Sequence, residues 1–66
     1  MSIRVNGSDV ELSGEFTLGG FLEREGYKKG RVAVIKNGEI VPAERFDAET
    51  LSGGDILEIV SFVGGG

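Results

Sequence analysis

The side chains that most often perform covalent chemistry are missing from this sequence. Its 66 residues include neither histidine nor cysteine, so the usual neutral-pH base, the thiolate nucleophile and the commonest soft metal ligands are absent. The serines therefore lack a histidine that could activate them. The eleven acidic residues are scattered over turns and positions expected to face solvent, whereas paired catalytic carboxylates need a cleft. We therefore expect no catalytic residue, no bound cofactor and no metal site.

The unusual chemical group is instead the carboxylate at the end of the sequence. The last residues are Phe62, Val63 and then Gly64, Gly65 and Gly66. A flexible thread without side chains could enter an enzyme channel that any Cβ would block. An ionised carboxylate is a poor electrophile, so reaction at Gly66 would first require adenylation with ATP by a separate enzyme. The activated acyl carbon could then accept sulfide, giving a thiocarboxylate, or an amine, giving a conjugate.

Composition limits the other possibilities. The length predicts one domain, near the lower limit for a core that folds without disulfides or metals. A net charge of −4 argues against nucleic acid as a partner, and the only basic cluster (Lys28, Lys29 and Arg31) is too small for such a footprint. The acidic surface favours partners with a basic docking face. With neither an apolar signal region nor a run of ~20 apolar residues, we expect a cytoplasmic protein with no membrane partner.

The pattern of apolar residues predicts the elements that must hold the tail. Alternating apolar residues around an Asn6-Gly7 turn predict a hairpin over 2–13. Thr17 is a suitable N-cap for a short helix over 18–25 that ends at Gly26. In that helix Gly19 and Gly20 oppose helix formation and would lie where another element packs closely.

The second half of the sequence predicts two further strands and the strand that carries the tail. The run over 32–35 and a second Asn-Gly turn at Asn37-Gly38 predict a hairpin that ends at Pro42. Residues 43–51 predict a turn of helix and a loop, and the longest strand is expected over 56–63. This order predicts an α+β fold of the β-grasp, ubiquitin-like type, in which about five mixed strands pack on one helix. The final strand should pair in parallel with the first at the centre of the sheet, so residues 1–63 form the domain and 64–66 the flexible tail.

Several blocks of this sequence resemble the ThiS family of sulfur carrier proteins of thiamin biosynthesis over essentially the whole length. They are Ile3 to Gly7, Thr17-Leu18, Val32 to Pro42, Gly54 to Val60, and Phe62 to Gly66. The block over 32–42, with its Asn-Gly turn and Val-Pro ending, is the most specific of them. A terminal Gly-Gly alone would fit any ubiquitin-like modifier.

The resemblance implies a co-substrate rather than an enzyme. By its motif the carboxylate of Gly66 is adenylated by a ThiF-type enzyme, converted to a thiocarboxylate with sulfur from a donor protein, and used by a ThiG-type thiazole synthase. Gly65 and Gly64 complete the tail. The alternatives in the same fold are a sulfur carrier for molybdopterin and a protein modifier that joins Gly66 to lysines. A third possibility is a β-grasp interaction domain whose tail is inert.

The last strand predicts a docking surface as well. Val60 and Phe62 fall on one face of this strand, and Leu57 and Ile59 fall on the other. Both faces cannot pack on a single helix. We expect Val60 and Phe62 to form part of an exposed apolar patch that docks the activating enzyme. The alternative is a second small core beneath the loop over 43–51.

Overall fold

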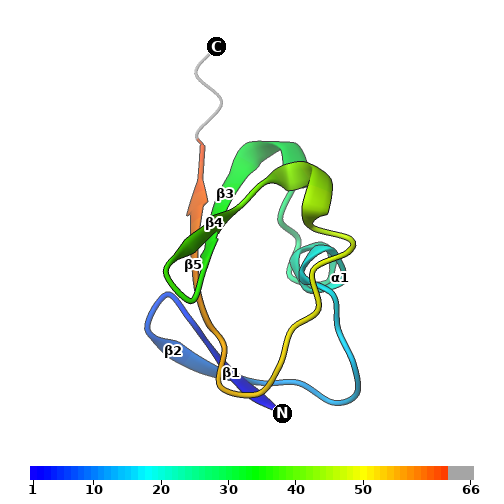
Figure 1. Cartoon of the computed structure of the whole chain (residues 1–66), viewed down its shortest axis with the longest axis vertical. Helices are drawn as coiled ribbons and strands as arrows, with labels where there is room; N and C mark the ends of the chain where they lie inside the picture. The colour runs from blue at the N-terminus through cyan, green and yellow to red at the C-terminus, as the bar shows by residue number, and fades with distance from the viewer. Residues whose placement is uncertain (63–66) are drawn as a thin grey trace.

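The computed structural model describes residues 1–62, and its elements follow the predicted order (Figure 1). Strands β1 (Ser2–Val5) and β2 (Ser8–Glu11) form the first hairpin, and helix α1 (Leu18–Arg24) follows. A 3₁₀ turn, η1 (Lys29–Arg31), precedes the second hairpin, made of β3 (Val32–Lys36) and β4 (Glu39–Val41). A second 3₁₀ turn, η2 (Ala43–Arg45), and a loop lead to β5 (Ile56–Ser61).

The strands form one mixed sheet in the order β2-β1-β5-β3-β4. The last strand lies at its centre, where β5 runs parallel to β1 and antiparallel to β3. The sheet lies on one side of the molecule, with α1 and the segment after η2 on the other (Figure 1). This arrangement confirms the predicted five-stranded β-grasp fold, with the parallel pair at its centre.

Helix α1 is one residue shorter than the predicted 18–25 and begins as expected. The Thr17 hydroxyl accepts a hydrogen bond from the Gly20 amide at 3.0 Å, which satisfies one of the free amides of the first turn. Glu25 is the C-cap, and Gly26 follows at φ +84°, the left-handed conformation that ends helices.

The core lies between α1 and the sheet. Because the segment that follows η2 binds the start of α1, it closes one side of this core: Leu18 N donates to Glu49 O at 2.7 Å and Gly19 N donates to Phe46 O at 2.8 Å. Phe46 and Leu51 are therefore buried in the main core. The buried apolar residues form one cluster: Ile3, Leu12, Leu18, Phe21, Leu22, Val32, Val34, Val41, Phe46, Leu51, Leu57 and Ile59.

The opposite face of the sheet has no covering element among residues 1–62, and we call it the open face. Leu57 and Ile59 point into the core, whereas Ile56, Val60 and Phe62 are exposed. The alternative of a second small core under the loop over 43–51 is therefore wrong, since that loop packs on α1 and contributes to the same core as the sheet. The predicted strand over 56–63 ends at Ser61, and Val63 lies outside the described residues.

Candidate functional site

The end of β5 is held firmly in the sheet, and this fixes where the predicted tail begins. β5 pairs with β3 over five residue positions, from Lys36 opposite Leu57 to Val32 opposite Ser61. One residue further, Phe62 N donates to Arg31 O at 2.7 Å. The backbone is thus hydrogen-bonded up to Phe62. The predicted tail residues, Gly64, Gly65 and Gly66, lie outside the described residues.

Two asparagines hold β5 from either side. Asn6 follows β1, and its side chain forms two hydrogen bonds with the backbone of Ile59, accepting from the amide at 2.8 Å and donating to the carbonyl at 3.2 Å. Asn37 follows β3, and its Oδ1 accepts from Ile56 N at 2.9 Å. Both asparagines have positive φ, +49° and +50°, as expected for the first position of an Asn-Gly turn. Each turn therefore also anchors the strand that carries the tail.

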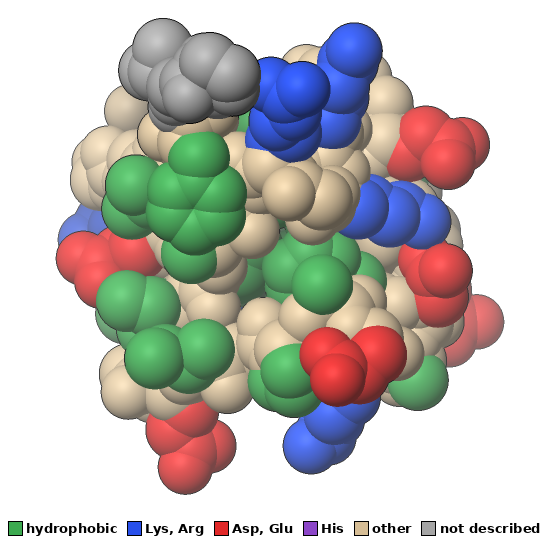
Figure 2. Space-filling view, turned by 90° about the horizontal axis from the view of Figure 1, so that it is seen from above, with side chains coloured by type: hydrophobic (Ala, Val, Ile, Leu, Met, Phe, Trp, Pro, Cys, Tyr) green, Lys and Arg blue, Asp and Glu red, His purple; other side chains and the backbone are tan. Residues whose placement is uncertain are grey.

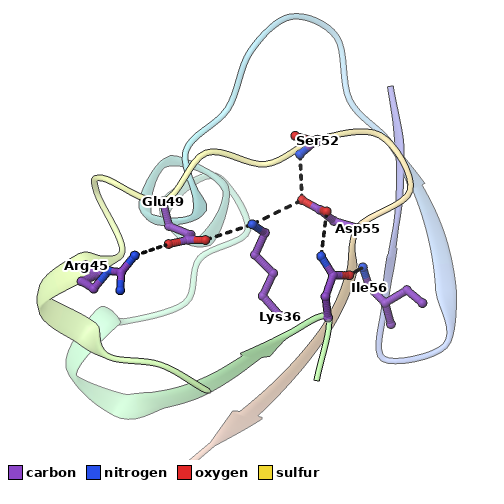
Figure 3. Close-up of polar contacts among 7 residues, drawn as sticks. Lys36, Arg45, Glu49, Ser52, Asp55 and Ile56 are labelled. Carbon is purple, nitrogen blue, oxygen red and sulfur yellow. Dashed lines mark hydrogen bonds and ion pairs between the residues drawn. The ribbon is translucent and has the colours of Figure 1, made fainter. Parts of the chain in front are cut away.

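A buried acid links the turn before β5 to the second hairpin (Figure 3). Asp55 is buried, and its carboxylate accepts from Ser52 N at 2.7 Å and from Asn37 Nδ2 at 3.0 Å. Lys36 Nζ lies 3.8 Å from the same carboxylate and 2.9 Å from Glu49 Oε2. The network thus joins β3, the loop over 43–51 and the start of β5.

The electrostatics of this network favour the charged forms of Lys36 and Glu49. The hydrogen bond from Lys36 holds the pKa of Glu49 below its ordinary value, against the opposing effect of desolvation. The same bond raises the pKa of Lys36, assisted by the charges of Asp55 and Glu49. We assign these residues a structural role, because each forms a hydrogen bond or ion pair with another member of the network.

The open face carries the expected apolar patch. Val60 is 55% exposed and Phe62 is 56% exposed, so both side chains are available to a partner. Val60 lies opposite the half-buried Ala33 of β3. Viewed from the end of the molecule where β5 terminates, hydrophobic side chains gather on one side of the surface (Figure 2). The predicted exposure is confirmed, and docking of an activating enzyme stays a prediction.

The remaining surface of residues 1–62 has hollows lined in part by charged side chains. A shallow pocket of about 140 Å³ is lined by Lys36 and Arg45 together with Glu39 and Glu49, so the charges around it cancel. No group of three acidic residues suited to a metal ion occurs in this part of the chain. In the same residues, no helix is long and apolar enough to cross a membrane.

Sequence reasoning found the patch and the turns but missed what the turn side chains do. The Asn-Gly pairs predicted hairpins, and nothing in the local pattern showed that Asn6 and Asn37 also bind β5, which is distant in sequence. The Lys36–Asp55 contact was missed for the same reason. The predicted central position of the last strand does not by itself show which side chains of its neighbours bind it.

The family comparison covers nearly the entire sequence. The model of the ThiS family matches residues 3–66. The crystal structure of thiamine biosynthesis protein ThiS from Geobacter metallireducens superposes with a TM-score of 0.83, at 33% identity and over the full length of both chains. The solution structure of a thiamine biosynthesis protein from the same organism gives 0.79 at 33% identity, covering all of this chain and 88% of the other.

A curated relative is a much longer protein. The thiazole synthase of Paramagnetospirillum magneticum is 38% identical over 66 residues, which is 100% of this chain and 20% of that protein. The chain thus spans about a fifth of this relative. Both the fold and the sequence agree with the family model, which reaches the terminal glycines, and we conclude that this chain belongs to the ThiS family.

Proposed function

We propose that this protein carries sulfur for the thiazole of thiamin as a thiocarboxylate on Gly66. The observation that supports the proposal best is the ThiS family match, which extends to residue 66 and so includes the tail. The described fold agrees with it, because β5, the strand before the tail, ends at one end of the molecule (Figure 1). In this role the protein is a co-substrate rather than a catalyst.

The chemistry proceeds in two displacements. First, the Gly66 carboxylate attacks the α-phosphorus of ATP, forming an acyl-adenylate and releasing pyrophosphate. Mg²⁺ or cationic groups of the activating enzyme stabilise the charge on the phosphates. A sulfide equivalent from a donor protein then attacks the acyl carbon and AMP leaves, so that one oxygen of the carboxylate is replaced by sulfur. A thiazole synthase finally takes the sulfur.

The partners belong to the proposal too. A ThiF-type enzyme would adenylate the tail, docking on the apolar patch of Val60 and Phe62, which lies where the tail begins. A thiazole synthase would accept the sulfur. This second partner is supported by the relative named thiazole synthase, in which a segment 38% identical to this chain forms part of a longer protein. We place these reactions in the cytoplasm, with ATP as a substrate of the activating enzyme.

Adenylation provides the first test. The purified protein is mixed with the ThiF-type enzyme of the same organism, Mg²⁺ and ATP, and ATP–pyrophosphate exchange is measured. We expect exchange with the full chain and none with a variant lacking Gly65 and Gly66, although both fold alike by circular dichroism. Equal exchange with the truncated variant would disprove the assignment of the reactive carboxylate.

The alternative functions of a β-grasp protein with this tail predict different experimental results. A carrier for molybdopterin would accept AMP but fail to support thiazole formation with thiazole synthase. A protein modifier would appear as ladders of conjugates on other proteins. An inert interaction domain would keep its mass unchanged in the presence of enzyme and ATP.

A further inference from the structure

The positive charges of this protein are distributed unevenly. Of its seven Lys and Arg residues, five lie within 4.0 Å of a carboxylate in the described part of the chain. The two with no ion pair among residues 1–62 are Lys28 and Arg31. Neither forms a side-chain hydrogen bond there, and both are exposed. Within residues 1–62, two cations thus stand without a carboxylate partner, in a protein of net charge −4.

Both cations lie at the end of the molecule where β5 terminates. The carbonyl of Arg31 accepts the hydrogen bond from Phe62 N at 2.7 Å, and the carbonyl of Lys28 accepts from Arg31 N at 2.8 Å. η1 therefore sits directly beside the last described residue of the chain. From this end, Lys and Arg side chains gather on one side of the surface and hydrophobic side chains on another (Figure 2).

This placement has a consequence for any protein that receives the tail. A partner that covers Phe62 also comes within reach of Arg31, since the backbones of these residues are hydrogen-bonded. Displacing water from a cation is unfavourable unless an opposite charge takes the place of the water. The neighbouring Lys29 is already paired with Asp47 at 2.7 Å, so in the described part of the chain only one of the three clustered cations is neutralised by the carrier itself.

We propose that Lys28 and Arg31 form a cationic contact beside the tail, which binds carboxylates at the mouth of the channel of the adenylating partner. This inference rests on the proposed function and specifies the surface chemistry of the partner. It also refines the expectation that an acidic carrier needs a basic docking face. At the tail the complementary surface combines an apolar pocket for Phe62 with acidic side chains for Arg31 and Lys28. Such charges govern encounter and orientation more than the chemical step.

Kinetics of adenylation test this contact. We compare the wild type with Arg31→Gln, the double variant Lys28→Gln/Arg31→Gln, and the matched control Arg4→Gln. The control removes one exposed arginine at the opposite end of β5, where Arg4 pairs with Ile56 and contacts Asp9 at 3.2 Å. All variants should fold alike, because exposed charges contribute little to stability.

We expect the double variant to raise the KM for the carrier roughly three- to thirtyfold at low salt, as two exposed ion pairs imply, with kcat unchanged. Added salt should reduce the difference in KM between the double variant and the wild type. Arg31→Lys should recover most of the affinity that Arg31→Gln loses, and Arg4→Gln should have the KM of the wild type. Equal KM values for all variants, while the wild type is adenylated, would overturn the contact and leave the proposed function intact. A raised KM for ATP alone would overturn it too, since the cations would then serve the nucleotide. A wild type that accepts no AMP overturns both.

Discussion

At the scale of single residues, a few polar side chains hold β5 in place. Asn6 makes a two-point contact with the backbone of Ile59, and Asp55 joins the turn before β5 to Asn37. Such bonds matter because a buried backbone group left without its partner costs about 1–3 kcal/mol. β5 is thus held by side chains of the turns that follow β1 and β3, far from it in sequence.

Replacing Asn6 tests this positioning. Asn6→Ala removes both hydrogen bonds to Ile59 and places alanine at positive φ, which costs about 1–2 kcal/mol by itself. We expect the free energy of unfolding to fall by about 2–3 kcal/mol. Asn6→Asp keeps the acceptor for Ile59 N and tolerates positive φ, so it should lose less. Urea denaturation measures both, and an alanine variant as stable as the aspartate variant would contradict the role of the side chain.

The decrease of the unfolding free energy at low pH tests the Lys36–Glu49 pair. Since Lys36 lowers the pKa of Glu49 in the folded state, the pair stabilises the protein above the unfolded pKa of a glutamate, about 4.3. That contribution disappears as the pH falls through the lower folded pKa. We expect Glu49→Gln to flatten the loss of unfolding free energy below about pH 4.5, and Glu44→Gln, at an exposed position, to leave it unchanged. The same decrease of unfolding free energy at low pH in the wild type and in Glu49→Gln would contradict the pairing.

At the scale of elements, local patterns were sufficient for most of the fold. Period-2 alternation and two Asn-Gly turns gave both hairpins, and Thr17 and Gly26 marked the ends of the helix. Residues 43–51 form the predicted turn of helix and loop, but the sequence left open where Phe46 and Leu51 pack. A sparse pair of apolar residues in a polar stretch does not reveal the element on which they pack. Here backbone hydrogen bonds from Leu18 and Gly19 determine that contact.

Gly19 lies in this same contact. The position is buried, and a Cβ added there would clash with the carboxylate of Asp47 and lie 3.3 Å from its backbone nitrogen. We expect Gly19→Ala to lower the unfolding free energy by about 1–3 kcal/mol, as overpacking does, despite the better helix propensity of alanine. The matched variant Gly20→Ala is exposed and meets only the Thr17 hydroxyl, so its cost should be smaller. Thermal unfolding compares the two, and a Gly19→Ala protein more stable than Gly20→Ala would refute the close approach.

At the scale of the whole molecule, the sheet has one face for stability and another that stays open. The core uses Leu57 and Ile59, while the open face presents Val60, Phe62 and, further along, Ile56 and Ile40. The apolar patch and the two cations of the proposed contact, Lys28 and Arg31, adjoin the end of β5. A receiving enzyme could therefore bind both while the tail enters it. The sequence could not predict this grouping, because Arg31 and Phe62 become neighbours only through the pairing of β3 with β5.

Docking through the patch is tested by truncating Phe62. Phe62→Ala should leave stability nearly unchanged, because the side chain is 56% exposed, yet raise the KM for adenylation about tenfold, as loss of an aromatic anchor does. Ile56→Ala is the matched control, since Ile56 is 52% exposed at the other end of β5. A Phe62→Ala carrier adenylated as efficiently as the wild type would remove the docking role.

The mass of the protein isolated from cells starved of thiamin tests the central claim most directly. We expect a fraction of the molecules to show one oxygen replaced by sulfur, with fragmentation placing the change on Gly66. The change should vanish in cells that lack the activating enzyme. An unchanged mass in starved cells that are making thiazole, or sulfur located anywhere other than Gly66, would contradict the account.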